Sequence, residues 1–165
     1  MTALVGLGGN LGDPRKNLAL AVSHLARFFK VEKKSSLYRT APVGGPAGQP
    51  VCYNAVVDVA TQGGPKDTMN VLRSIERRLG RIKAEKWAPR IIDLDLLDQD
   101  GIIVEDEDLI LPHPMLHLRA FVLMPLNEIA PKWRHPRLNM TTMEMLDKLS
   151  SEDKAVILAV EDWPE

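Results

Sequence analysis

WAPRIIDLDLL, at residues 87–97, is the stretch that decides the fold. Its first half is a cationic loop with a proline, and its second half alternates apolar and acidic residues as a strand does. Because successive side chains of a strand point to opposite faces, Asp93 and Asp95 share one face while their apolar neighbours pack inward. Two carboxylates about 7 Å apart can hold hard cations such as Mg²⁺. Arg90 beside them adds a fork for phosphate oxygens, so the stretch predicts a metal-assisted phosphate site.

The same stretch has a simpler interpretation, a solvent-facing strand edge. Like charges on one face of a strand cost stability unless a cation or hydrogen bonds offset them. Residues 87–97 alone give the metal site and the solvated edge equal weight. The remainder of the chain has to decide between them.

The composition favours one soluble domain. The 165 residues are enough for a single domain with a substantial core. The 21 Lys and Arg against 22 Asp and Glu leave the net charge near zero, which argues against a general attraction to nucleic acid or anionic membranes. Cys52 is the one cysteine, which excludes an intramolecular disulfide and a multi-cysteine zinc site. No stretch has the roughly 20 apolar residues of a membrane span or the pattern of a signal peptide, so we expect a cytoplasmic domain over residues 1–165.

The N-terminal region suggests a strand, a glycine-rich turn and a helix. Residues 3–8 are an apolar run typical of a buried strand, and Asp13 with Pro14 is a favourable cap and first turn for a helix. This order would suit a dinucleotide-binding fold, in which the turn holds a pyrophosphate. However, Leu11 occupies the place of the third glycine, and no acidic residue ends the next extended stretch at residues 31–40. A Rossmann fold is therefore disfavoured.

The middle of the chain supplies a loop, a strand and a second helix. Residues 41–50 are rich in Pro and Gly, which is typical of a linker between domains or of a loop. Because the flanking pieces are too short to be domains, a mobile loop that covers a site is favoured over a linker. Residues 52–59 resume as a strand, with Asn54 near the loop. Its amide can offer a donor and an acceptor to a heterocycle or simply hold the loop. The second helix ends at Gly80, and Glu76 lies at the edge of its apolar stripe, where glutamate is usually solvated.

The C-terminal half adds further candidate residues. Residues 102–104 are expected to form a hairpin with the aspartate strand, and residues 155–160 to form a buried strand. His113 is held between two prolines, and Arg119 follows six residues later. With Arg119 nearby, a functional role for His113 has the same weight as a structural one. Six cations at residues 77–90 favour a polyphosphate over nucleic acid, because a single aromatic residue accompanies them.

Several motifs occur in one order along the chain. They are GLGGNLGD, YRTAPVG, WAPRIIDLDLL, LPHP and RAFVL. The series closely resembles the 6-hydroxymethyl-7,8-dihydropterin pyrophosphokinase family of folate biosynthesis over residues 4–131, and WxPRxIDLD followed by LPHP is its most specific part. The resemblance implies a ferredoxin-like α+β sandwich, with a mainly antiparallel sheet, helices packed on one face and three mobile active-site loops.

The resemblance also implies the reaction. Family members transfer the β,γ-diphosphate of ATP to the hydroxymethyl group of 6-hydroxymethyl-7,8-dihydropterin and release AMP. The chain is thus expected to be an ATP-dependent diphosphotransferase, a single pyrophosphokinase domain over residues 1–165. Mg²⁺, as two ions, is the implied cofactor, with ATP as co-substrate. A monomer that binds neither nucleic acid nor membrane is expected.

Site residues follow from the same resemblance. Asp93 and Asp95 match its magnesium-binding aspartates, and Asp95 is a candidate to take the hydroxyl proton. The implied ATP-binding residues are Glu76, Arg81, Lys83, Trp87, Arg90, His113 and Arg119. The implied pterin-binding residues are Thr40, Pro42, Val43, Tyr53, Asn54 and Phe121. The implied catalytic residues are Arg81, Arg90, Asp93 and Asp95.

Two departures from the family pattern affect the site. Cys52 falls where the family usually has an aromatic residue that sandwiches the pterin against Phe121. Either one side of the sandwich is lost, which weakens binding by about 1 kcal/mol, or the loop shifts to bring in the neighbouring Tyr53. A further alternative is that the chain is a divergent family member, in which Cys52 reflects a change of substrate. Lys83, in place of a common second arginine, replaces a bidentate fork with a point charge.

The cationic residues of the segment 81–90 also suit a second class of function, a binding module. A non-catalytic ferredoxin-like module could hold a nucleotide or nucleic acid through residues 81–90. The near-neutral net charge and the lack of interleaved aromatic residues disfavour it.

Overall fold

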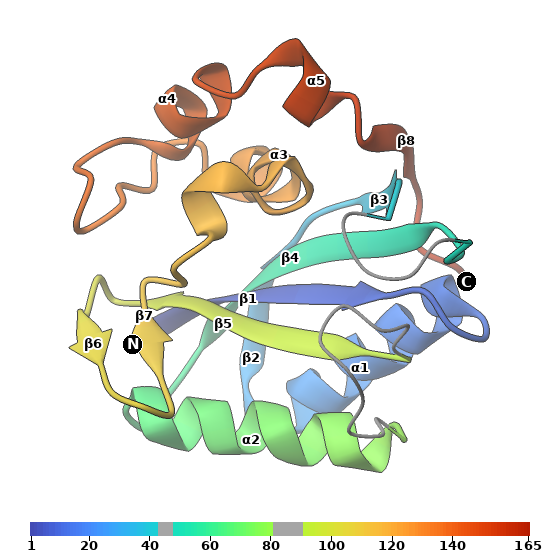
Figure 1. Cartoon of the computed structure of the whole chain (residues 1–165). Coiled ribbons are helices and arrows are strands. Elements are labelled where there is room, and N and C mark those ends of the chain that lie inside the picture. The colour runs from blue at the N-terminus through green and yellow to red at the C-terminus, as the bar shows by residue number, and fades with distance from the viewer. Residues whose placement is uncertain (43–47, 81–90) are drawn as a thin grey trace.

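The chain folds into one main antiparallel sheet with helices on both of its faces (Figure 1). The computed structural model describes residues 1–42, 48–80 and 91–165. In chain order the elements are β1 (Thr2–Gly9), α1 (Pro14–Phe28), β2 (Lys30–Lys34), β3 (Leu37–Thr40), β4 (Cys52–Ala60), α2 (Pro65–Arg78), β5 (Asp93–Gln99), β6 (Val104–Glu105), β7 (Ile110–Leu111), the 3₁₀ helix η1 (Leu116–Leu118), α3 (Ala120–Ile129), α4 (Thr142–Asp147), α5 (Ser151–Lys154) and β8 (Ile157–Glu161).

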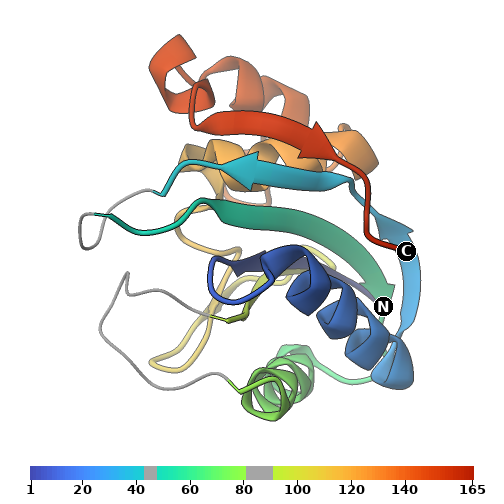
Figure 2. The same cartoon turned by 90° about the vertical axis from the view of Figure 1, so that its right-hand side faces the viewer.

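The main sheet has the strand order β5-β1-β4-β3-β8, and β2 also pairs with β4. All of these pairings are antiparallel. Figure 2 shows β1, β4, β3 and β8 side by side. The expected α+β fold with a mainly antiparallel sheet is confirmed. A Rossmann fold is excluded, because its sheet is mostly parallel.

Strand β5 has the alternation that its sequence predicts. Leu94 and Leu96 are buried, at 0% and 2% exposure, whereas Asp93 and Asp95 are partly exposed. The preceding Ile92 is also fully buried. Because the leucines pack under α1 and α2, the two aspartates face the other side of the sheet together.

Helices α1 and α2 cover the apolar face of β5. The Asp13 side chain accepts a hydrogen bond from the Lys16 N–H and caps α1, and Pro14 occupies the first turn, as the sequence predicts. Beyond α2, Gly80 has a φ of +88°, which residues with a side chain rarely adopt. The core between these helices and the sheet includes the fully buried Leu18, Leu25, Leu72 and Ile75.

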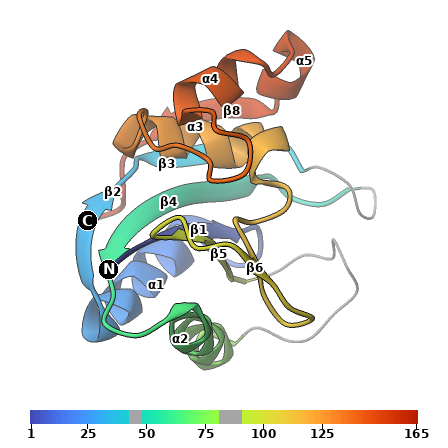
Figure 3. The same cartoon turned by 90° about the vertical axis from the view of Figure 1, so that its left-hand side faces the viewer.

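Helix α3 covers the opposite face of the sheet and α4 packs against α3 (Figure 3), so the expectation of helices on one face is wrong. A second core joins Leu4, Val56 and Leu97 of the sheet to Leu123 and Leu126 of α3. The central strands thus bury apolar side chains on both faces, and each buried face needs its own helical layer.

Two smaller predictions are also wrong. Residues 102–104 do not form a hairpin with β5; instead β6 pairs with β7 in a separate two-stranded ribbon. β8 is not a buried strand, since Leu158 and Val160 are 49% and 56% exposed. Within the described part of the chain β8 pairs with β3 alone, at the edge of the sheet. An apolar run therefore predicted the strand correctly but not its place in the sheet.

The expectation of three mobile loops concerns, in part, residues 43–47 and 81–90, which lie outside the described residues. The turn at residues 10–13 between β1 and α1 is described. None of the helices that the described ranges form is long and apolar enough to cross a membrane.

Candidate functional site

Two glycines of β1 form the floor of a cavity on the face of the sheet that carries α3. Gly8 pairs with Asn54 of β4 on one side and with Asp93 of β5 on the other. Gly6 pairs with Asp95. Paired residues of antiparallel strands project to the same face of a sheet. The missing side chains at Gly6 and Gly8 therefore leave an open space between the carboxylates of β5 and the amide of β4.

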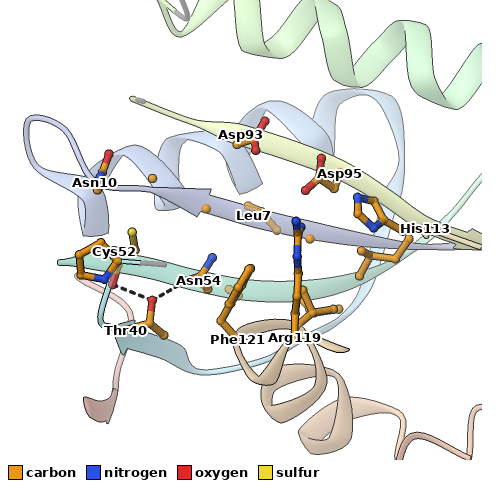
Figure 4. Close-up of a pocket in the computed structure, with 18 of the residues that line it drawn as sticks. Leu7, Asn10, Thr40, Cys52, Asn54, Asp93, Asp95, His113, Arg119 and Phe121 are labelled. Carbon is orange, nitrogen blue, oxygen red and sulfur yellow. Dashed lines mark hydrogen bonds between the residues drawn. The ribbon is translucent and has the colours of Figure 1, made fainter. Parts of the chain in front are cut away.

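This space is part of a cavity of about 300 Å³. Figure 4 shows that side chains from β3, β4, β5 and the start of α3, together with His113, surround it. Of the residues expected to bind ATP, metal or pterin, those that line the cavity are Thr40, Pro42, Asn54, Asp93, Asp95, His113, Arg119 and Phe121. One cavity thus joins the expected metal ligands to the expected pterin residues.

The acidic end of the cavity carries concentrated negative charge. Burial, together with the negative charges of Asp93 and Glu76, raises the pKa of Asp95 from 3.8 to about 7. The cations Arg119 and Arg73 act in the opposite direction. A carboxyl in such a setting either keeps a proton near neutral pH or gains stability from a bound cation.

His113 lies next to the aspartates as a neutral imidazole. Burial, together with the positive charge of Arg119, lowers the pKa of His113 to about 4. Its Nδ1 accepts a hydrogen bond of 3.2 Å from the Met115 N–H, so the ring proton is on Nε2. Its backbone N–H donates to the carbonyl oxygen of Leu97 at 2.9 Å and so ties His113 to β5. The imidazole can therefore donate one hydrogen bond from Nε2 without carrying charge.

The opposite end of the cavity presents an amide. The Thr40 hydroxyl donates to Oδ1 of Asn54 at 2.8 Å, which fixes the orientation of the amide (Figure 4). The Nδ2 of Asn54 then points toward the glycine floor, where a Cβ on Gly8 would lie 2.8 Å from it. Thr40 is 1% exposed, so its hydroxyl can turn little away from Asn54. The site thus offers an oriented N–H donor to the edge of a flat ligand.

An aromatic side chain faces this amide from the start of α3. Phe121 lines the cavity and is partly exposed. The guanidinium carbon of Arg119 lies 5.4 Å from the centre of its ring, within the range of a cation–π contact. Arg119 consequently lies between the acidic end and the aromatic wall (Figure 4).

The structure decides between Cys52 and Tyr53. Cys52 lines the cavity, and burial raises the pKa of its thiol. Tyr53 points to the opposite face of β4, where it packs against the core under α1 and its hydroxyl bonds to Glu161 at 3.1 Å. The expectation that Tyr53 belongs to the pterin pocket is therefore not met. Neighbouring residues of a strand face opposite sides, so bringing Tyr53 in would require a one-residue slip of β4.

Glu76 has a different position from the one expected. It is 2% exposed and not solvated, and it lies on α2, on the far side of β5 from the cavity. Its Oε2 accepts a hydrogen bond of 2.9 Å from the Leu94 N–H, and its Oε1 accepts one of 2.8 Å from Arg73. Glu76 does not line the cavity as the described residues form it.

Five expected site residues are outside the described part of the chain. They are Val43, Arg81, Lys83, Trp87 and Arg90. Their expected roles remain predictions from the sequence.

Sequence reasoning missed some residues that line the cavity. Asn10 and Gln49 do so, and the Asn10 Nδ2 donates to the Gln49 Oε1 at 3.2 Å. The role of Gly6 and Gly8 was also missed, because the two glycines were considered only as part of a dinucleotide-binding motif, which the sequence disfavoured. Their spacing of two residues within a strand was the available signal, since it places both on one face.

The donor set at the acidic end fits a magnesium ion. The described residues contain no group of three or more His, Cys, Asp or Glu side chains placed to hold a metal. Mg²⁺ characteristically uses one or two carboxylates and takes its remaining ligands from water and substrate phosphates. Asp93 and Asp95, which share one face of β5 and open to a cavity, meet that requirement.

Comparison with known proteins gives a consistent result. Residues 4–131 match the model of the family described as 7,8-dihydro-6-hydroxymethylpterin-pyrophosphokinase (HPPK). A 2-amino-4-hydroxy-6-hydroxymethyldihydropteridine pyrophosphokinase of Synechocystis is 40% identical over 149 residues, covering 89% of this chain and 75% of the relative. The Methylorubrum extorquens protein of the same name is 46% identical over 131 residues, covering 78% and 82%.

Solved structures agree on the fold. A Plasmodium falciparum HPPK-DHPS chain crystallised with pteroate superposes with a TM-score of 0.71 at 16% identity. The match covers 89% of this chain and 44% of the Plasmodium chain, so this chain spans less than half of that longer protein. At this identity the likeness concerns the fold alone.

Proposed function

Because the chain belongs to the 7,8-dihydro-6-hydroxymethylpterin-pyrophosphokinase family, we propose that the cavity over Gly6 and Gly8 brings the nucleotide and the pterin together for direct diphosphate transfer. The protein is a pyrophosphokinase of folate biosynthesis, which makes the pterin diphosphate and AMP from ATP. The observation that carries the site assignment is the glycine floor, with Asp93 and Asp95 on one side and Asn54 on the other.

The acidic end is the proposed place of the triphosphate. Asp93 and Asp95 would hold Mg²⁺, as two ions, which supply charge neutralisation at the β-phosphorus. The Arg119 guanidinium can pair with phosphate oxygens, and the Nε2–H of His113 can donate to another. Arg81, Lys83, Trp87 and Arg90 are proposed as further nucleotide contacts from the resemblance alone.

The amide end is the proposed place of the pterin. The Nδ2 of Asn54 would donate to an acceptor on the heterocycle edge, with Thr40 holding the amide. Phe121 would stack on one face of the ring, and Pro42 lines the same cavity. Val43 is proposed as a further pterin contact from the resemblance alone. The opposite face would meet the small Cys52, so one half of an aromatic sandwich is absent and the remaining stacking depends on Phe121.

Positioning and charge account for most of the proposed chemistry. With the pterin against Asn54, its hydroxymethyl group is directed toward Asp93 and Asp95. Its oxygen bonds to the β-phosphorus, the bond from this phosphorus to the α,β-bridging oxygen breaks, and AMP leaves with the electron pair. Asp95 takes the hydroxyl proton. This requires no strong base, because phosphoryl groups transfer through a loose transition state.

The proposed setting of the reaction is the cytoplasm, on the single cysteine and the near-neutral net charge. ATP and the pterin alcohol are the proposed binding partners. Neither nucleic acid nor a membrane is part of this proposal, and the expected working form is a monomer.

The nucleotide product tests the function. From ATP and 6-hydroxymethyl-7,8-dihydropterin we expect AMP, in an amount equal to the pterin diphosphate, because two phosphoryl groups move together. Ion-exchange chromatography of the quenched reaction measures both products. Excess EDTA should stop turnover and added Mg²⁺ should restore it. ADP as the main nucleotide product would assign the enzyme to ordinary single-phosphate transfer.

The aromatic wall can be tested separately. Phe121→Ala is expected to weaken pterin binding by about 10-fold, because the stacking and the buried ring area are lost. Calorimetric titration with the pterin, in the presence of a non-hydrolysable ATP analogue, measures the affinity. Phe28→Ala is the matched control, since Phe28 is 47% exposed on α1, away from the cavity. Equal pterin affinity in Phe121→Ala and wild type would remove Phe121 from the site.

A further inference from the structure

The outer edge of β5 is held by side chains of α2. Among the described residues, β5 pairs in the main sheet with β1 alone, so no strand of this part of the chain bonds the backbone groups that β5 turns away from β1. At Leu94 two side chains supply the bonds instead. The Leu94 N–H donates to Oε2 of Glu76 at 2.9 Å, and Arg73 donates to the Leu94 carbonyl oxygen at 3.4 Å. Glu76 and Arg73 thus act as a substitute strand at one residue.

A charged residue at this place in α2 requires a reason. Position 76 follows the buried Leu72 by one helical turn and is itself 2% exposed, so an apolar side chain would fit the stripe. Burying a carboxylate costs free energy unless both oxygens have partners. Here one oxygen has the Leu94 N–H and the other has Arg73 at 2.8 Å. One of these two partners is therefore the backbone of β5 itself.

Leu94 is the residue between Asp93 and Asp95. A peptide group held from outside the sheet cannot twist freely, and both neighbouring carboxylates are attached to that peptide segment. We propose that Glu76, supported by Arg73, is a positioning residue that fixes the peptide at Leu94 and so sets the spacing and direction of the two metal-binding aspartates. This inference rests on the metal role given to Asp93 and Asp95 in the proposed function.

A second carboxylate clamp lies at another place in the chain, on a glutamate that is exposed where Glu76 is buried. Glu128 of α3 accepts hydrogen bonds from the Ser36 N–H at 2.8 Å and from the Tyr38 hydroxyl at 2.8 Å. Like Glu76, it is a helix carboxylate that accepts hydrogen bonds from a strand region. Its partners lie in β3 and in the residue before β3, not in β5. Its loss therefore reports what a carboxylate clamp contributes to stability alone.

The test compares Glu76→Met, Glu76→Gln and Glu128→Met in the full chain. Methionine has a similar volume but cannot accept the Leu94 N–H bond, whereas the glutamine Oε1 still can. In the substrate-free protein, hydrogen exchange measured by NMR should show the Leu94 amide exchanging about 10-fold faster in Glu76→Met, with the Val57 amide of β4 as reference. In Glu76→Gln its rate should stay close to that of the wild type.

The second measurement uses Mn²⁺ as the metal probe. The dissociation constant of Mn²⁺ with α,β-methylene ATP, read from the electron spin resonance of bound Mn²⁺, should rise about 10-fold in Glu76→Met, as for other residues that orient metal ligands. Glu76→Gln should rescue most of this loss, and Glu128→Met should bind as the wild type does.

Three results would overturn the positioning role. They are wild-type Mn²⁺ affinity in Glu76→Met, an equal loss in Glu76→Gln, which would point to charge, and an equal loss in Glu128→Met, which would point to general destabilisation. Failure of the wild type to bind Mn²⁺ would overturn the metal site itself. The exchange of the Leu94 amide would still report the clamp in that case.

Discussion

Asp95→Asn is expected to lower turnover by about 10³-fold while leaving the fold intact, because a neutral amide cannot neutralise the charge of a metal–nucleotide complex. The carboxylate lies on a strand whose apolar face is fully buried, so its replacement by an isosteric amide leaves the packing under β5 unchanged. Steady-state release of AMP from ATP and the pterin measures the effect, and circular dichroism checks the fold. Turnover close to that of the wild type would remove Asp95 from the catalytic machinery.

The same substitution should stabilise the substrate-free protein at neutral and alkaline pH. Burial raises the pKa of Asp95 to about 7, so the folded state binds this proton more tightly than the unfolded chain does. The stability from the protonated carboxyl is therefore complete below about pH 4 and is lost as the pH rises toward 7. Asparagine has no proton to lose. Urea unfolding at pH 8 should show Asp95→Asn more stable by roughly 2–4 kcal/mol, with little difference at pH 4.

Asp98→Asn is the control for the turnover measurement. Asp98 is on the same strand, is 3% exposed, and burial raises the pKa of its carboxyl, but it bonds to the Gly101 N–H and the Trp133 indole N–H and does not line the cavity. Its turnover should equal that of the wild type. A loss like that of Asp95→Asn would mean that any neutral substitution in β5 disables the enzyme.

Gly8→Ala is expected to lower kcat/KM for the pterin by about 10²-fold. The added Cβ would lie 2.8 Å from the Nδ2 of Asn54, closer than such contacts allow, so the amide or β1 has to shift. Asn54 is already held by Thr40 on its other side, and misplacement of a recognition group by about 1 Å costs on this scale. Kinetics at saturating ATP with varied pterin measure the change.

Gly6→Ala is the matched comparison on the same strand face. Its Cβ would meet the methyl groups of Leu97 at 3.5 and 3.6 Å, which is ordinary contact. Its effect should therefore be several-fold smaller than that of Gly8→Ala. Equal losses would mean that bulk anywhere on the floor is what matters, and not the position of Asn54.

Local patterns predicted the elements well. The alternation around Asp93 and Asp95, the cap at Asp13 and the stop at Gly80 each depend on a few consecutive residues, and the structure confirms all three. They succeeded because side-chain periodicity and backbone preference are properties of the segment itself. The family motifs then brought most of the site residues together, including His113 and Arg119.

Tertiary placement was beyond those patterns. The sequence could not tell that a helical layer would cover Val56 as well as the opposite face of β4, or that β8 would lie at the edge. Glu76 was expected to be solvated, because the sequence of its helix does not indicate that the helix packs beside the edge of β5, where Glu76 bonds to the Leu94 N–H. Tyr53 was expected as a substitute for an aromatic residue at Cys52, although strand alternation already opposed it.

The glycine floor has a consequence for inhibitors of this enzyme. A compound bound over Gly6 and Gly8 contacts main-chain atoms, and an amino-acid substitution cannot remove those atoms. Resistance at these two positions could arise only by adding atoms, and at Gly8 the added atoms would displace the amide that the natural substrate also needs. Few resistance substitutions at this floor would therefore leave the activity of the enzyme intact.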